Sequence, residues 1–316
     1  MDLKIEKVKE SRIKEVDFSK LSFGRTFADH MFICEYKDGK WQNPTIKPYG
    51  ALSLEPSASV FHYGQAVFEG MKAYKDDNGH VFLFRPQENY KRINKSCERL
   101  AMPAFPEEWF DKALRTLVDI DSEWIKPGFG NALYLRPFVI ATTPGVQASP
   151  AKDYLFIIIT APVQSYYSGD VRVKIADYYS RAANGGFGFA KAAGNYAGQF
   201  YPTQQAAAEG YQQVMWTDDA THQYLEEAGT MNLWFRLGDT LVTCPTSERI
   251  LDGVTRKSII AVAEKLGIKT EIRPVKVTEL IEAAENGTLK EAFGCGTAAV
   301  ILVQYQLLAT KARIMR

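Results

Sequence analysis

Residues 154–180 read YLFIIITAPVQSYYSGDVRVKIADYYS and contain three kinds of segment in succession. The first, YLFIIITAPV, is almost entirely apolar and far shorter than the roughly 20 residues of a membrane helix, which is typical of a buried strand. The second, QSYYSGD, favours a turn or a linker, and the third, VRVKIADYYS, is another β-type run. The stretch therefore predicts the junction of two domains: a small N-terminal domain at 1–163, a linker at 164–173 and a large domain at 174–316.

Strand and helix patterns lie on both sides of this junction. Before it, β-type runs are mixed with helical patterns, of which the clearest is EEWFDKALRTLVDI at 107–120, where apolar residues recur at helical spacing. Beyond it, short β-type runs come first, and Gly238-Asp239 is predicted to form a hairpin turn. Two helical patterns follow, closed by Gly267 and Gly287. Clustered strands with interspersed helices predict an α+β protein rather than a regular alternation of strand and helix.

Composition and charge argue against several classes of protein. Lys+Arg 38 against Asp+Glu 37 leave a net charge of +1, so there is no basic excess for binding a nucleic-acid backbone. The N-terminal sequence MDLKIEKVKESRIKEVDF lacks the apolar run of about 7–15 residues that a signal peptide needs. Four cysteines without a CxxC pair, in a chain of this length, favour a reducing compartment. We expect a cytoplasmic protein that binds neither nucleic acid nor a membrane.

The most unusual local composition occurs in RAANGGFGFAKAAGNYAGQ at 181–199, where Lys191 lies among five glycines and six alanines. Small residues let the backbone approach another group closely and leave a lysine accessible but poorly hydrated. Such a lysine suits Schiff-base chemistry. The segment matches neither GxGxxG nor the phosphate loop GxxxxGK[ST]. On composition alone, a tightly packed surface loop with an incidental lysine fits equally well.

Three further segments are candidates for a binding site. In EEAGTMN, Glu226 and Glu227 are adjacent in a strand and face opposite ways, so one can point into a cavity while the other points at water. Two solvated acids at a strand end are the commoner arrangement. LDGVTRKS at 251–258 and FGCGTAA at 293–299 could each offer backbone N–H groups to an anion. Many helices start this way, but coexistence with a candidate reactive lysine favours a catalytic site.

With these motifs the sequence resembles the branched-chain amino-acid aminotransferases, in the fold type IV group of enzymes that use pyridoxal 5'-phosphate (PLP). The resemblance runs from about Phe23 to about Val300. The matching stretches, in order, are FGRTFADHM, YGQAVFEGMKAY, FRPQENYKRI, YLRP, KAAGNYAG, EEAGTMN, LDGVTRKS and FGCGTAA. It implies a small α/β domain, a larger β-barrel-like domain with flanking helices, and a homodimer in which a loop around Tyr63–Met71, or the YLRP region, reaches the partner's pocket.

Carried over to the matching positions, the resemblance implies a site for PLP. Lys191 would hold the cofactor as a Schiff base and then carry the proton between the substrate Cα and the cofactor. Glu227 would partner the pyridine nitrogen, with Glu226 as its solvated neighbour, and Tyr196 would bond the phenolic oxygen. The phosphate group would meet Arg92, the backbone N–H groups of Val254 and Thr255, and Thr297.

The resemblance also implies a pocket that accepts either an aliphatic side chain or the γ-carboxylate of glutamate. Tyrosines with polar tips on apolar bodies can serve both guests. The aromatic walls would be Phe27, Tyr63, Phe68 and Tyr166. Tyr134 and Arg136 of YLRP would receive the γ-carboxylate. The substrate α-carboxylate would meet the N–H groups of the turns at Thr230 and Ala298.

We therefore predict a transaminase that moves the amino group of L-leucine, L-isoleucine or L-valine to 2-oxoglutarate by a ping-pong mechanism. Within the same fold, a D-amino-acid aminotransferase or an aminodeoxychorismate lyase is the alternative, although FEGMKAY and EEAGTMN favour the branched-chain enzymes. The segment ILVQYQLLATKARIMR, from Ile301, departs from the family's pattern and is expected to be a truncated or altered end. A chain that binds PLP without transferring an amino group is the remaining alternative.

Overall fold

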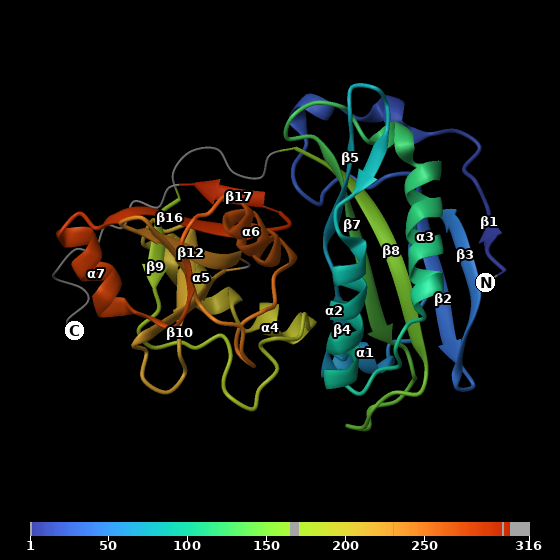
Figure 1. Ribbon diagram of the computed structural model, residues 1–316. Helices are drawn as coiled ribbons and strands as arrows, with labels where there is room; N and C mark the ends of the chain where they lie inside the picture. Colours follow the sequence, from blue (N-terminus) through green and yellow to red (C-terminus); the bar gives the residue numbers. More distant parts are fainter. Residues whose placement is uncertain (1, 165–170, 230, 299, 304–316) are drawn as a thin grey trace. The chain divides into compact units, whose positions relative to one another are not determined.

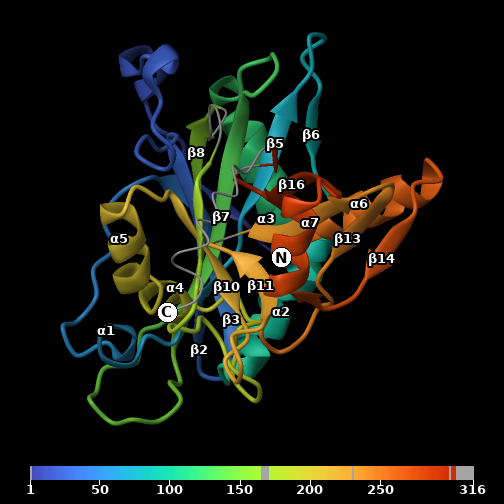
Figure 2. The same cartoon turned by 90° about the vertical axis from the view of Figure 1, so that its left-hand side faces the viewer.

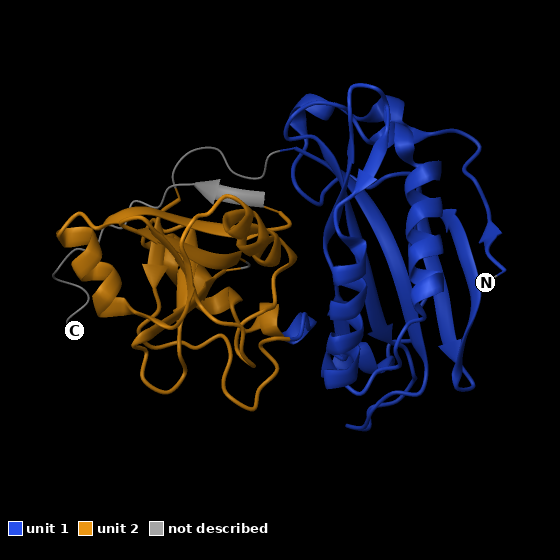
Figure 3. Ribbon diagram, viewed as in Figure 1, with its two compact units in different colours: residues 1–166, 190–194 blue, residues 167–189, 195–316 orange. Residues whose placement is uncertain are grey.

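The computed structural model describes residues 2–164, 171–229, 231–298 and 300–303 (Figures 1 and 2). The chain divides into two compact units: unit 1 comprises residues 1–166 and 190–194, and unit 2 comprises residues 167–189 and 195–316 (Figure 3). The segment with Lys191 thus belongs to unit 1, although it follows that unit's other residues in the sequence. Residues 165–170 of the predicted linker, and the predicted altered end from residue 304, lie outside the described residues.

Unit 1 is built on a single sheet. Within the described residues, eight strands pair in the order β1-β3-β2-β8-β7-β5-β6, with β4 beside β7. The strands are β1 (Lys4–Ile5), β2 (His30–Lys37), β3 (Lys40–Pro48), β4 (Ala66–Phe68), β5 (Met71–Lys75), β6 (Val81–Leu83), β7 (Ala132–Ala141) and β8 (Tyr154–Val163). The long antiparallel pair of β7 and β8 places the apolar run that opened the predicted junction at the centre of the sheet.

Two helices, α2 (Pro86–Arg99) and α3 (Glu107–Ile120), pack on this sheet, and the short helix α1 (Ser59–Tyr63) precedes β4 (Figure 1). Helix α3 confirms the helix predicted at 107–120. Its Phe110, Leu114 and Leu117 are buried in one cluster with Phe32 of β2 and Phe156 of β8. Each such side chain contributes roughly 1.5–3 kcal/mol when it is removed from water. This core makes the sheet a rigid support for the loops at its ends.

Unit 2 contains a second sheet, which curls on itself (Figure 1). Within the described residues its main path is β14-β13-β12-β11-β10-β9, and β15 and β16 join it at β11 and β12. Its elements are β9 (Val173–Ile175), α5 (Phe200–Ala208), β10 (Gln213–Thr217), β11 (Tyr224–Ala228), β12 (Met231–Leu237), β13 (Thr240–Thr243), α6 (Val254–Lys265), β14 (Thr270–Ile272), β15 (Val275–Lys276), α7 (Val277–Glu285), β16 (Leu289–Gly296) and β17 (Val300–Val303). A further short helix, α4 (Ala193–Ala197), begins in unit 1 and ends in unit 2.

The turns that close these elements are those expected from the glycines. Gly238 links β12 to β13 with φ +58°, and Gly267 and Gly287 follow α6 and α7 with φ +69° and +76°. Glycine adopts such backbone angles at less cost than residues with a Cβ. The mixture of helices and two sheets confirms the α+β prediction. No helix among the described residues is long and apolar enough to cross a bilayer. Cys34, Cys97, Cys244 and Cys295 are all free and buried.

Candidate active site

Arg92, the arginine predicted to bind phosphate, lies on the buried face of α2 in unit 1. Its Nε donates to Oε1 of Glu69 at 2.6 Å and its Nη2 to Oε2 at 2.9 Å. Asn89 Nδ2 adds a hydrogen bond to Oε2 at 2.7 Å. Burial alone would raise the pKa of the fully buried Glu69, but the charge and hydrogen bonds of Arg92, with smaller contributions from Lys191 and Asn89, lower it below its usual value. Arg92 is therefore held by a carboxylate that the sequence did not single out.

Lys191 is fixed to unit 1 through its own backbone. Its N–H donates to the Ser96 hydroxyl at 2.9 Å, and its carbonyl accepts from the Phe68 N–H at 3.0 Å. The next residue, Ala192, forms an isolated β-bridge with Val67. The Lys191 amine lies 4.8 Å from the centre of the Phe68 ring. The glycine-rich segment is therefore anchored at its lysine rather than being a loose surface loop.

Unit 1 also brings together three of the predicted substrate residues. The Arg136 guanidinium lies 4.4 Å from the centre of the Phe68 ring, and its Nε donates to the Tyr134 hydroxyl at 3.0 Å. Phe68 therefore contacts both the Lys191 amine and the Arg136 guanidinium, an arrangement favoured by the negative face of an aromatic ring. Gly70 lies against Tyr134, because a Cβ built on Gly70 would overlap the Tyr134 hydroxyl. The aromatic, the guanidinium and the lysine form one group.

The remaining predicted substrate residues have other neighbours in the structure or lie outside the described residues. Phe27 stacks on Tyr49, with ring centres 4.8 Å apart. Tyr63 is 46% exposed, and its hydroxyl donates to the carbonyl of Val146. Two further candidates, Tyr166 and Thr230, lie outside the described residues.

In unit 2, the predicted ring-nitrogen partner Glu227 forms a buried ion pair. Arg181 Nη2 lies 2.6 Å from Glu227 Oε1, and the two side chains are 5% and 6% exposed. Asn232 Nδ2 and the Leu251 N–H approach the other oxygen, Oε2, at 3.4 Å, the outer limit of hydrogen-bond length. One Glu227 oxygen therefore pairs with the Arg181 guanidinium, and the other accepts long hydrogen bonds from Asn232 and the Leu251 N–H.

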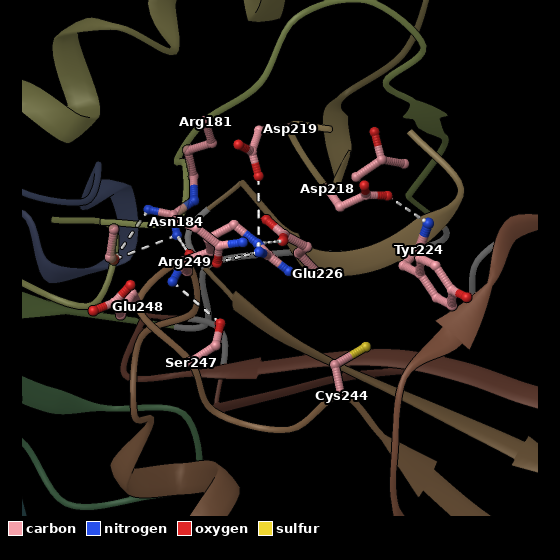
Figure 4. Close-up of polar contacts among 12 residues, drawn as sticks. Arg181, Asn184, Asp218, Asp219, Tyr224, Glu226, Cys244, Ser247, Glu248 and Arg249 are labelled. Carbon is pink, nitrogen blue, oxygen red and sulfur yellow. Dashed lines mark hydrogen bonds and ion pairs between the residues drawn. The ribbon is translucent and has the colours of Figure 1, made fainter. Parts of the chain in front are cut away.

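The prediction that Glu226 is solvated is wrong. Glu226 is 2% exposed and pairs with Arg249, which also contacts Asn184 and Asp219 (Figure 4). Burial raises the pKa of Glu226, and the nearby Arg249 opposes that effect. The two adjacent glutamates do face opposite ways, as strand geometry requires, but the second face is also covered by protein. The sequence pattern predicted that the two side chains point in opposite directions, but not that protein covers both of them.

Arg181 also connects the glycine-rich segment to the backbone at Arg249. Its guanidinium approaches the Gly188 carbonyl at 3.4 Å and donates to the Arg249 carbonyl. Gly188 has to be a glycine here, because an added Cβ would come within 2.8 Å of the Arg249 carbonyl oxygen. Sequence reasoning named neither Arg181 nor Arg249. The available signal was an arginine at the start of a segment otherwise made of small residues.

The predicted anion cradle in unit 2 is a helix N-terminus. Gly253 caps α6, and no side chain accepts a hydrogen bond there, so the N–H groups of Val254 and Thr255 open the helix without a side-chain cap. An added Cβ on Gly253 would overlap the Asn232 side chain. Thr297 and Ala298 form the turn after β16, and Tyr196 lies in α4. An uncapped helix start is a binding site for an anion.

Comparisons with known proteins agree with this fold. A family model described as amino-transferase class IV matches residues 66–302. The chain is 46% identical to branched-chain-amino-acid transaminase 1 of Bacillus subtilis over 95% of this chain and 86% of that protein. It is 42% identical to a branched-chain-amino-acid aminotransferase of Mycolicibacterium smegmatis over 92% and 81% of the two chains.

Solved structures show the same fold at lower identity. The branched-chain aminotransferase of Thermoproteus uzoniensis, solved with norvaline, superposes with a TM-score of 0.72 at 24% identity, over 87% of this chain and 86% of that chain. The branched-chain amino acid aminotransferase of Escherichia coli gives a TM-score of 0.70 at 24% identity, over 87% and 84% of the two chains. The two sheets and the lysine segment are therefore those of a known architecture.

The fold and the family match define a class IV aminotransferase, an enzyme class that works with PLP. At 42–46% identity over more than nine-tenths of its length, the chain belongs to the branched-chain amino-acid aminotransferases of that class. It is a PLP-dependent transaminase. Each unit by itself offers groups that suit this cofactor. In unit 1, the buried arginine suits a phosphate and the anchored lysine suits a covalent bond. In unit 2, the uncapped helix start suits a phosphate and the buried carboxylate suits a pyridine nitrogen.

Proposed function

We propose that the chain transfers the amino group of L-leucine, L-isoleucine or L-valine to 2-oxoglutarate, giving the branched 2-oxo acid and L-glutamate. The observation that carries the proposal is the group in unit 1 in which Phe68 contacts both the Lys191 amine and the Arg136 guanidinium. An apolar ring beside a cation can receive an aliphatic side chain in one half-reaction and a γ-carboxylate in the other. The relatives named for branched-chain substrates support the same reading.

Each remaining residue has a separate task in the proposed site. PLP, when bound, supplies the electron-accepting ring that makes the substrate Cα proton removable. The Lys191 amine takes that proton and returns it, since its tether keeps it within reach of the carbon. Glu227 holds a proton at the ring nitrogen, and Tyr196 bonds the phenolic oxygen. Arg92, the N–H groups of Val254 and Thr255, and the Thr297 hydroxyl hold the phosphate.

Substrate orientation is assigned to the residues that the family resemblance implies. In the proposed site, Arg136 and Tyr134 bind the γ-carboxylate of glutamate or 2-oxoglutarate, and Phe68 packs on the aliphatic side chain. The α-carboxylate is assigned to backbone N–H groups at Thr230 and Ala298. Phe27, Tyr63 and Tyr166 complete the aromatic walls in this proposal.

A substrate panel tests the function directly. Purified protein with PLP, L-leucine and 2-oxoglutarate should release L-glutamate, whereas D-alanine and aminodeoxychorismate should not react. Activity with D-alanine or lyase activity would assign the chain to a neighbouring group of the same fold. A rise of the melting temperature with PLP, without glutamate formation, would identify a chain that binds the cofactor and is inactive.

Gly70→Ala is expected to impair the 2-oxoglutarate half-reaction in particular. The new methyl group would displace the Tyr134 hydroxyl, which accepts the hydrogen bond of Arg136. Because a hydrogen bond to a charged group is worth about 1.5–3 kcal/mol, we expect KM for 2-oxoglutarate to rise roughly tenfold or more. Steady-state kinetics with each substrate varied measures this. Gly50→Ala is the matched control, since a Cβ there meets nothing within 4 Å; equal effects of the two variants would contradict the role of Tyr134.

We also infer a cytoplasmic homodimer. Free, buried cysteines are compatible with a reducing compartment. The exposed rings of Phe61 and Tyr63, at 61% and 46% exposure on α1, favour contact with a second copy of the chain, as the family resemblance suggested. Light scattering on the PLP-loaded protein should give twice the chain mass of 35.5 kDa. A monomer mass under the same conditions would refute the dimer.

A further inference from the structure

One face of α2 is polar although it is buried. Asn89, Arg92 and Ser96 are three and four residues apart, so their side chains lie on the same side of the helix. They are 2%, 9% and 1% exposed. Buried polar groups cost free energy unless they are hydrogen-bonded, so a row of three requires a set of partners on the opposing segment.

Ser96 connects this helix to the backbone of Lys191. Its hydroxyl donates to the Arg92 carbonyl at 2.9 Å and accepts the Lys191 N–H at 2.9 Å. The bond to the carbonyl one turn earlier fixes the rotamer of Ser96, so the acceptor lone pair points in one direction. The Lys191 N–H is therefore held by a side chain that is itself locked to the helix.

The strand end opposite the helix completes a closed circuit of hydrogen bonds. The Phe68 N–H binds the Lys191 carbonyl at 3.0 Å. The neighbouring residue, Glu69, binds the Arg92 guanidinium through both of its oxygens. Two adjacent residues of the strand end thus hold Lys191 and Arg92, and Ser96 joins the same two residues from the helix side. Such a fully paired buried network is rigid, because shifting one member leaves others unpaired.

We propose that Ser96 is a positioning residue that fixes the Lys191 backbone relative to the Arg92 helix turn. The inference rests on the proposed roles of Lys191 and Arg92, which act on two different groups of one PLP molecule, the aldehyde carbon and the phosphate. The lysine amine must reach the reacting carbon while the arginine holds the phosphate, so the spacing between the two backbones sets how well both groups are held. Glu69 supports the same geometry by orienting the guanidinium.

Ser96→Ala in the PLP-loaded protein tests the proposal. Removing the hydroxyl leaves the Lys191 N–H without its acceptor. We expect kcat/KM to fall roughly 10- to 100-fold, as expected for a misplaced catalytic group. We also expect a weaker affinity for PLP and a shift in the pH at which the visible spectrum of lysine-bound PLP changes, which loss of packing alone does not produce. Ser96→Cys keeps a weak donor and acceptor of similar size and should give an intermediate effect.

Ser59→Ala is the matched control. Ser59 is also a buried serine of unit 1, 5% exposed, and its hydroxyl has no hydrogen-bond partner among the described residues. It should keep kcat/KM and the spectrum within about twofold of the unchanged protein, because no bond is lost. Thermal unfolding of the PLP-free variants shows whether each variant is folded. If Ser96→Ala does not fold, the kinetic and spectral measurements on Ser96→Cys test the proposal.

The possible outcomes separate this inference from the proposed function. If the unchanged protein shows no PLP bound at Lys191, the proposed function fails. If PLP is bound there, but the folded Ser96 variants match Ser59→Ala in kinetics and in the spectral pH titration, only the positioning role is overturned. A spectral and kinetic change in Ser96→Ala, smaller in Ser96→Cys and missing from Ser59→Ala, supports it.

Discussion

Lys191→Ala is expected to remove the visible absorption of lysine-bound PLP and to lower transamination by at least about 10⁴-fold. General acid–base catalysis by a positioned group contributes roughly 10²–10⁴-fold, and this variant also loses the covalent attachment of the cofactor. The fold should survive, because unit 1 holds this segment through the backbone N–H and carbonyl of residue 191, which alanine keeps. Absorption spectra and leucine-dependent glutamate formation measure the two effects.

Lys72→Met is the control for that experiment. Lys72 is a buried lysine of unit 1, 5% exposed, and burial lowers the pKa of its amine to about 8. It therefore has some of the properties of a reactive lysine without the glycine- and alanine-rich segment that surrounds Lys191. The variant should keep the visible absorption band of lysine-bound PLP. After reduction with borohydride, it should also keep PLP covalently attached to the protein as a stable label. Loss of the label in Lys72→Met and its retention in Lys191→Ala would refute the assignment.

Arg181→Met is expected to lower the free energy of unfolding by about 3–5 kcal/mol, because it leaves the Glu227 carboxylate buried without its counter-charge. The pair is only 5–6% exposed, so water cannot replace the guanidinium. The variant also breaks the contacts of Arg181 with the Gly188 and Arg249 carbonyls. Denaturant unfolding of the PLP-free protein, followed by tryptophan fluorescence, measures the loss.

A second substitution separates the effect of the unpaired Glu227 charge from the effect of the lost Arg181 hydrogen bonds. Arg181→Met combined with Glu227→Gln removes both charges, so much of the lost stability should return, while PLP-dependent activity should not. Lys174→Met is the surface control in the same unit, because its pair with Glu209 is 33% and 37% exposed and is worth at most about 1 kcal/mol. If Arg181→Met were as stable as Lys174→Met, the buried Arg181–Glu227 ion pair would not contribute to stability as we expect.

The sequence predicted those parts of the candidate site that are marked by an unusual segment around the residue itself. Lys191 and the Glu226-Glu227 pair stand in segments whose composition or turn residues are unusual, and the family resemblance gave them roles. Their partners could not be predicted. Arg249 is 23 residues from Glu226, and Ser96 is 95 residues from Lys191, so no spacing rule connects them. Glu226 was expected in water because nothing in its own strand shows what covers the second face.

What the sequence determined by itself was helix α3, several turns and the family, and it marked the segments that carry the candidate site residues. Apolar periodicity defined α3, glycines at positive φ defined the turns after β12, α6 and α7, and motif order defined the family. Only the tertiary structure decided which charged groups became paired. A buried carboxylate such as Glu69 or Glu227 must find a counter-charge to offset its lost hydration, and the fold supplies one from wherever the chain has been brought close.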